Sequence, residues 1–172
     1  MKKLVIIMIL IWYSSLKAQF ISGSLRVDGL TCSMCSKTVH KALSELSYID
    51  SIMPDLQTAS FKLVFKKNAK VELCDIKNKV EGAGFSIGEI KINYLFSNLN
   101  ISDNVSFSDN RTYKFVGVNA KALNGITTFK LIDKEFTSKK DFTKNQKNTK
   151  YKEAFINIKP SCDPVNPIHI TI

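Results

Sequence analysis

The 172-residue sequence predicts an α+β fold, and two periodic patterns carry this prediction. Apolar residues recur at helical spacing in two short segments, and they alternate with polar residues in the segments between. The composition, with 44% hydrophobic and 23% charged residues, is that of a globular protein. The chain is long enough for one ordinary domain or two small ones.

The two patterns follow each other in a definite order between residues 24 and 92. The expected elements are strand 24–27, a helix from Cys35 to Leu46, strand 49–56, strand 61–65, helix 73–83 and strand 85–92. Pro54 cannot donate a ladder hydrogen bond, so its strand is expected at a sheet edge. The order β-α-β-β-α-β, with right-handed crossovers, predicts a ferredoxin-like sandwich of four antiparallel strands backed by two helices.

Residues 93–172 are expected to form a small β-rich C-terminal module after the 24–92 domain. Strands are predicted at residues 105–107, 112–118, 126–132, 155–158 and 168–172. Asn124-Gly125 predicts a hairpin turn between two of these strands. The Lys-, Asn- and Thr-rich stretch from Phe136 to Lys152 is expected to be a long exposed loop, and no helix is predicted in this half.

Residues 1–18 have the features of a secretory signal peptide. Lys2 and Lys3 precede the apolar run Leu4–Trp12, and Ala18-Gln19 offers a cleavage point. The run is shorter than the roughly 20 apolar residues that span a bilayer, so cleavage is favoured over a membrane anchor. The protein is therefore expected to be exported, periplasmic or secreted, and not membrane-spanning after cleavage.

The chain is basic, with a formal net charge of +10. A basic surface attracts nucleic acid or anionic membranes, but an exported protein rarely meets nucleic acid. We therefore expect no nucleic-acid partner and interpret the charge as a contribution to solubility. The lysines from Lys134 to Lys152 suit an acidic partner or a membrane surface as an alternative to the favoured solvated loop.

The segment Gly29-Leu30-Thr31-Cys32-Ser33-Met34-Cys35 carries the chemical information. Cys32 is expected in a loop and Cys35 in the first turn of a helix that begins there, so that both sulfurs face one point. Free N–H groups and the positive end of the helix dipole favour thiolate over thiol. Two thiolates suit Cu(I) or a similar soft ion, whereas a structural Zn(II) site needs four ligands. Their open coordination sphere lets the thiolates of an acceptor take the ion.

Residues 24–92 resemble a heavy-metal-associated (HMA) domain, the module of copper chaperones, copper-ATPase N-termini and the periplasmic mercury-binding protein. The family motif G-M-T-C-x-x-C corresponds to residues 29–35, with Leu30 in place of methionine. Gly84-Phe85 matches the glycine and aromatic residue that the family carries near the end of its second helix. The resemblance covers about 70 of the 172 residues and does not extend into the C-terminal half.

The resemblance implies a non-enzymatic metallochaperone-like protein with Cys32 and Cys35 as its metal ligands. Gly29 and Thr31 would shape the loop, and Phe85 would shield the site. The implied cargo is Cu(I), buffered or passed to a metal-transporting membrane protein or another thiolate-bearing acceptor. Scavenging of Hg(II) or another soft metal remains an alternative, as does a thiol-disulfide oxidoreductase that uses the same pair. No Ser-His-Asp set or marked carboxylate pair indicates another enzyme.

The remaining sulfur and imidazole groups are weaker candidates. Cys74 and Cys162 allow a second metal site, a disulfide or two unrelated cysteines, of which the last two are favoured because export permits disulfides. Met34 is expected to point to solvent rather than to bind metal. His40 and His169 are expected to be surface residues.

Overall fold

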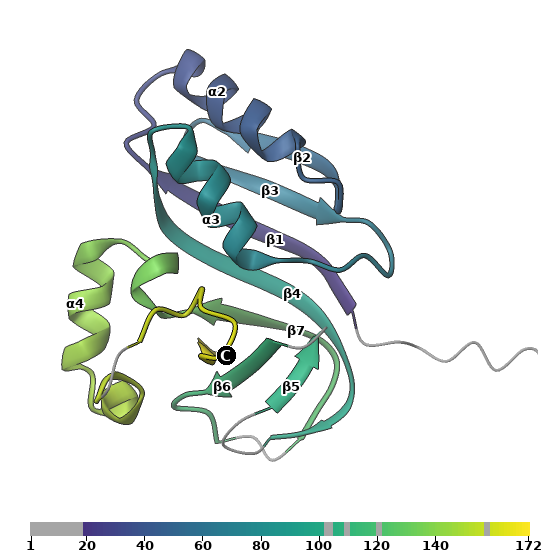
Figure 1. The fold of residues 1–172 in the computed structure, drawn as a ribbon, viewed down its shortest axis with the longest axis vertical. Helices are drawn as coiled ribbons and strands as arrows, with labels where there is room; N and C mark the ends of the chain where they lie inside the picture. Colours follow the sequence, from purple (N-terminus) through teal and green to yellow (C-terminus); the bar gives the residue numbers. More distant parts are fainter. Residues whose placement is uncertain (1–18, 102–104, 109–110, 120–121, 157–158) are drawn as a thin grey trace, which may run out of the picture.

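Across the residues that the structure describes, the protein has an α+β architecture built on one eight-stranded sheet, and Figure 1 shows how its elements are arranged. The computed structural model describes residues 19–101, 105–108, 111–119, 122–156 and 159–172. The expected signal peptide, residues 1–18, lies outside the described residues. Among the helices that are described, none is both long and apolar enough to cross a membrane.

The first half has the predicted β-α-β-β-α-β order. Its elements are β1 (Gln19–Asp28), α2 (Ser33–Ser44), β2 (Ile49–Asp55), β3 (Ser60–Phe65), α3 (Leu73–Gly82) and β4 (Ser86–Asn100). The strand order β2-β3-β1-β4 places β2, with Pro54, at the edge of the sheet, as predicted. Both helices lie on one face of these strands, and each buries an apolar stripe there (Figure 1).

The second half continues the same sheet in the order β7-β8-β6-β5. Its elements are β5 (Val105–Ser108), β6 (Arg111–Phe115), β7 (Ala122–Leu131), η1 (Lys134–Phe136), α4 (Lys139–Lys147), η2 (Thr149–Phe155) and β8 (Ile168–Thr171). Four of the five predicted strands are confirmed within a few residues. The predicted strand 155–158 is wrong at its start, because Phe155 ends the 3-10 helix η2; residues 157 and 158 are outside the described part.

The prediction of a long exposed loop between Phe136 and Lys152 is wrong, because helix α4 occupies most of this segment. The Ser138 side chain accepts a hydrogen bond from the Asp141 amide (3.1 Å), which caps the start of the helix. Phe142 is the buried residue of α4 and packs edge-on against Phe155, with ring centroids 5.4 Å apart. A single buried aromatic leaves no apolar stripe in the sequence, so helical periodicity gave no signal.

The predicted hairpin at Asn124-Gly125 is also wrong. Both residues lie inside β7, and Gly125 pairs with Phe96 of β4. Gly125 has a φ of +80°, and the β4–β7 register shifts between Phe96 and Leu99. A glycine with positive φ is required equally by a tight turn and by an irregular strand pairing, which explains the misassignment.

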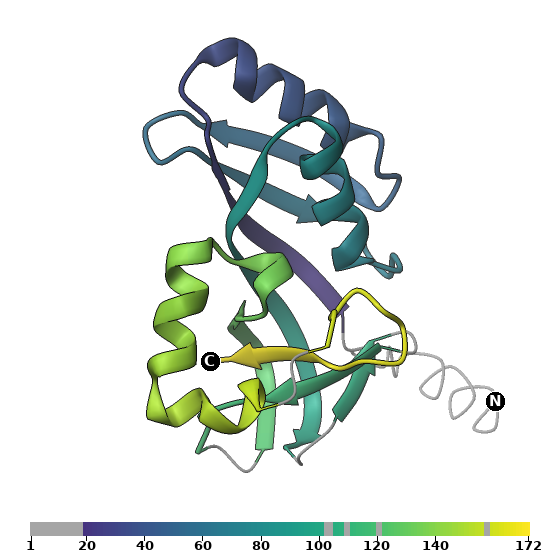
Figure 2. The same cartoon turned by 60° about the vertical axis from the view of Figure 1, so that its left-hand side comes forward.

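Strand β4 joins the two halves. It pairs with β1 through residues 86–95 and with β7 through residues 91–100, and Figures 1 and 2 show it curving from beneath α3 into the second half. The expected boundary after residue 92 thus falls inside β4, and the division into two domains stays a prediction. Aromatic rings continue across this position, with Tyr94 centred 4.9 Å from Phe20 and 6.4 Å from Phe129.

A disulfide between Cys74 and Cys162 ties the first turn of α3 to the C-terminal segment, 88 residues away in sequence. The Arg111 side chain donates hydrogen bonds to Cys74 Sγ (3.1 Å) and to the Asp163 carbonyl (2.9 Å). The structure therefore selects the disulfide among the three interpretations of these cysteines. A guanidinium beside Cys74 also opposes a second cation there, because like charges repel strongly in a poorly solvated site.

We expect removal of this disulfide to lower the free energy of unfolding by about 2–4 kcal/mol, because a long loop in the unfolded chain is no longer closed. The test is urea denaturation of a Cys74→Ser/Cys162→Ser variant under non-reducing conditions. A Cys32→Ser/Cys35→Ser variant is the matched control and should unfold like the wild type. Equal stability of all three proteins would contradict the prediction.

Candidate metal-binding site

Cys32 and Cys35 lie together at the N-terminus of α2. Helix α2 begins at Ser33, two residues earlier than predicted, so Cys32 is its N-cap residue and Cys35 its third residue. Cys32 has extended backbone angles (φ −147°, ψ 158°), and its Sγ accepts a hydrogen bond from the Cys35 amide at 3.2 Å. A sulfur thus takes the place that a Ser, Thr, Asp or Asn oxygen fills at most helix starts.

Both cysteines are free, and Cys32 is exposed whereas Cys35 is half-buried. The hydrogen bond from the Cys35 side chain lowers the pKa of Cys32 below its ordinary value, and the hydrogen bond from the Cys35 amide adds a smaller shift in the same direction. Burial opposes this shift, and the Met34 amide adds to it. The hydrogen-bond donors around Cys32, the Cys35 side chain first among them, therefore favour its thiolate form.

Gly29 allows the chain to turn from β1 into the loop that carries Cys32. Its φ of +89° is one that glycine adopts at little cost. Leu30, which replaces the methionine of the family motif, is partly buried and packs against the main core. Thr31 is exposed next to Cys32, and its predicted role in shaping the loop stays a prediction.

The turn after α3 places Phe85 beside this loop. The Phe85 amide donates to the Val80 carbonyl (3.1 Å) and the Gly84 amide to the Glu81 carbonyl (2.9 Å). With Gly84 at φ +87°, this is a Schellman motif, which fixes the direction of the chain after the helix. A Cβ built on Gly29 would lie 3.7 Å from Phe85 Cδ1, so the aromatic ring lies beside the base of the loop.

The other side of Cys32 is open. A cavity of about 220 Å³ lies between the cysteine loop and the β2–β3 turn, lined by Leu30, Thr31, Cys32, Ser33, Leu56 and Ala59. The Leu56 side chain at this turn is 62% exposed, and Met34 is 66% exposed. Met34 thus points to solvent, as predicted, and an incoming ligand has free access to Cys32.

In the part of the chain that the structure describes, no third His, Cys, Asp or Glu joins the two sulfurs to form a metal site. His40 is half-buried on α2. The surface prediction for His169 is wrong: its side chain is 15% exposed, and Nδ1 lies 2.8 Å from Asp133 Oδ1.

This donor set restricts the metals that suit the site. Two thiolates at a helix start satisfy a soft ion that accepts two-coordinate ligation. A structural zinc ion takes four ligands, and calcium takes six to eight oxygens, so two sulfurs alone suit neither.

The Heavy-metal-associated domain model matches residues 24–86. These residues belong to the heavy-metal-associated domain family. The match includes the loop, both cysteines and Phe85, and it supports heavy-metal binding by this part of the chain. The match ends at Ser86, the first residue of β4, and β4 then carries the chain into the second half.

Solved structures that this chain resembles cover about two fifths of it. The CopZ metallochaperone is 23% identical over 38% of this chain and 97% of its own length, with a TM-score of 0.36. Oxidized MerP from Ralstonia metallidurans CH34 is 28% identical over 41% of this chain and 96% of its own, with a TM-score of 0.35. The N-terminal domain of ZntA is 17% identical over 40% and 90%, with a TM-score of 0.35. No curated protein matches the chain.

We expect Cys32 to react as a thiolate at a lower pH than an ordinary cysteine, whose pKa is about 8.5. After mild reduction that leaves Cys74–Cys162 intact, the rate of Cys32 alkylation by iodoacetamide is followed against pH by peptide mass spectrometry. Because a lowered pKa leaves more thiolate at neutral pH, the midpoint should lie below that of a free thiol.

The variants of Cys35 separate the causes. Cys35→Ser keeps a side-chain donor and should retain a low midpoint, whereas Cys35→Ala loses the donor and should shift the midpoint upward. Identical midpoints in both variants would show that the side chain of Cys35 does not hold the Cys32 thiolate.

Proposed function

We propose that this protein binds Cu(I) outside the cytoplasm through the sulfurs of Cys32 and Cys35 and passes it to an acceptor that carries thiolates. The observation that supports this most is the pair of free cysteines at the start of α2. There Cys32 Sγ accepts a hydrogen bond from the Cys35 amide, and the pKa of Cys32 is lowered. Both thiols lose their protons on binding, and the soft ion is held by two sulfurs.

The exposed position of Cys32 supports transfer rather than permanent storage. A thiolate of the acceptor forms a new Cu–S bond while one bond to this protein breaks, and copper stays in the Cu(I) state throughout. The cavity beside Cys32 leaves room for such an approach, and Leu56 at its rim offers an apolar contact. A metal-transporting membrane protein is the proposed class of acceptor, and the protein itself acts as a carrier, not as an enzyme.

The proposed location outside the cytoplasm has two supports. The N-terminal sequence has the charge and apolar run of a signal peptide. The Cys74–Cys162 disulfide belongs in an oxidising compartment such as the periplasm or the cell exterior.

Copper affinity is the decisive measurement. The mildly reduced protein is titrated with Cu(I) against a competing chelator, and the wild type should bind one ion. Removing a partner outside the ligand shell costs roughly 10–100-fold in affinity, so loss of a direct ligand in Cys32→Ser or Cys35→Ser should cost more.

Met34→Leu is the matched control, because Met34 lies between the two cysteines with its side chain in solvent. Its affinity should equal that of the wild type. Equal copper uptake by the wild type and both serine variants would refute the proposal. Preferential retention of Hg(II) in a direct competition would instead assign the site to mercury.

A further inference from the structure

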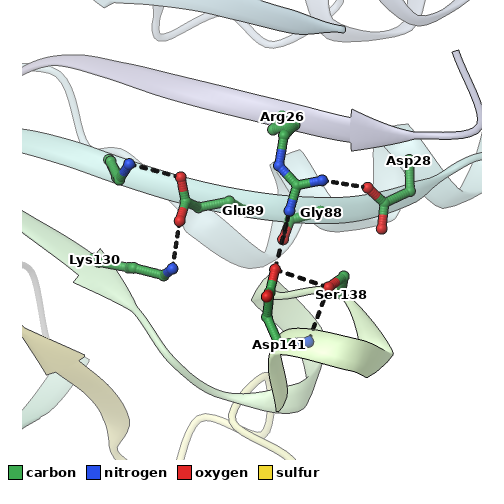
Figure 3. A network of polar contacts seen from close by, with 8 residues as sticks. Arg26, Asp28, Gly88, Glu89, Lys130, Ser138 and Asp141 are labelled. Carbon is green, nitrogen blue, oxygen red and sulfur yellow. Dashed lines mark hydrogen bonds and ion pairs between the residues drawn. The ribbon is translucent and has the colours of Figure 1, made fainter. Parts of the chain in front are cut away.

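Arg26 of β1 links the strand before the cysteine loop to α4 of the C-terminal half (Figure 3). Its Nη1 donates to Asp28 Oδ1 at 2.7 Å, and its Nη2 donates to the Gly88 carbonyl at 2.9 Å and to Asp141 Oδ2 at 3.1 Å. One guanidinium therefore contacts the end of β1, the start of β4 and the first turn of α4. Its planar fork of donors suits such a junction, which a lysine ammonium cannot reproduce.

A bulge in β4 makes this junction possible. Arg26 pairs with Glu89 but Val27 with Ile87, so Gly88 is the extra residue. A Cβ on Gly88 would lie 2.4 Å from Asp28 Oδ1 and 2.6 Å from Arg26 Nη1, so the ion pair occupies the space that a side chain would need. The Gly88 carbonyl also accepts a hydrogen bond from the Ser138 amide at 2.9 Å.

The junction includes residues next to the two chain segments that form the candidate metal site. Asp28 directly precedes Gly29, where the cysteine loop begins. Gly88 follows Phe85, which lies beside that loop, by three residues. From the C-terminal half, Asp141 and Ser138 hold Arg26 and Gly88 in place, and in Figures 1 and 2 α4 lies near the beginning of β4.

We propose that Arg26 is a positioning residue for the cysteine loop and that the C-terminal half, through Asp141, holds it in that role. This rests on the function proposed above and gives residues 93–172 a part in metal binding. The side chains of Arg26, Asp28 and Asp141 are 37%, 36% and 34% exposed. Ion pairs at such exposure add little to global stability. The proposed effect of Arg26 is therefore on the geometry of the cysteine loop and not on the free energy of unfolding.

The test compares three variants of the full chain. Asp141→Asn weakens the contact to Arg26 from the C-terminal side, and Arg26→Lys removes the fork. Lys130→Gln is the matched control, because it breaks an ion pair with Glu89 that also joins β4 to the second half (Figure 3).

Two quantities are measured on each protein. Amide hydrogen exchange of residues 29–35 in the metal-free protein reports on the loop itself, and competitive Cu(I) titration reports on affinity. Asp141→Asn and Arg26→Lys should both speed exchange in the loop and weaken Cu(I) binding by about tenfold, as loss of an outer partner typically does. Lys130→Gln should leave both quantities at their wild-type values.

The outcomes separate this proposal from the proposed function. Unchanged loop exchange in both Arg26→Lys and Asp141→Asn overturns it, whatever the copper affinity. Equal changes in all three variants also overturn it, since they would reflect a general loosening of the sheet. A wild type that binds no Cu(I) overturns the proposed function, while the exchange measurement on the metal-free protein still decides the role of Arg26.

Discussion

The rest of the structure depends on strand β4, which must pair with β1 and β7 at the same time. Its first residues follow the Schellman turn that places Phe85 beside the cysteine loop, and its last residues carry the sheet of the second half. The two pairings overlap at residues 91–95, so neither half can shift its register without disturbing the other. The bulge at Gly88 lies just ahead of this overlap and is where α4 reaches the strand.

The sequence predicted the first half well because its signals are local. Two apolar stripes define α2 and α3, alternation defines β3, and Pro54 allows only an edge strand. The second half lacked such signals. Helix α4 buries Phe142 alone, and the signal of its start is the Ser138-x-x-Asp141 spacing of an N-terminal capping motif, which apolar periodicity does not detect. At Gly125 the sequence signal was present but ambiguous, because a glycine with positive φ occurs both in tight turns and in irregular strand pairings.

The residues of the candidate site also fall into two groups, those that the sequence predicts and those that only the fold reveals. Cys32, Cys35, Gly29 and Phe85 were predictable because a motif and a helix end fix them within a few residues of sequence. Arg26 and Asp141 were not, because 115 residues separate them and only the folded sheet brings them together. The pairing of Cys74 with Cys162 was likewise open, since spacing alone does not choose among possible partners.

The two cysteine pairs of this chain show how environment decides what the same sulfur chemistry does. Cys74 is buried, and Arg111 donates a hydrogen bond to its sulfur, so binding of a metal cation there is unfavourable. Cys74 instead forms a disulfide with Cys162 on a distant segment. Cys32 is exposed at a helix start, where N–H groups favour a thiolate, and the Cys35 sulfur is the neighbouring donor. The proposed Cu(I) binding by Cys32 and Cys35 requires that the loop hold both sulfurs ready for the ion. The proposed junction at Arg26 would meet this requirement without adding a ligand, because Asp141, which lies outside the HMA match, holds a residue that contacts the strands on either side of the loop.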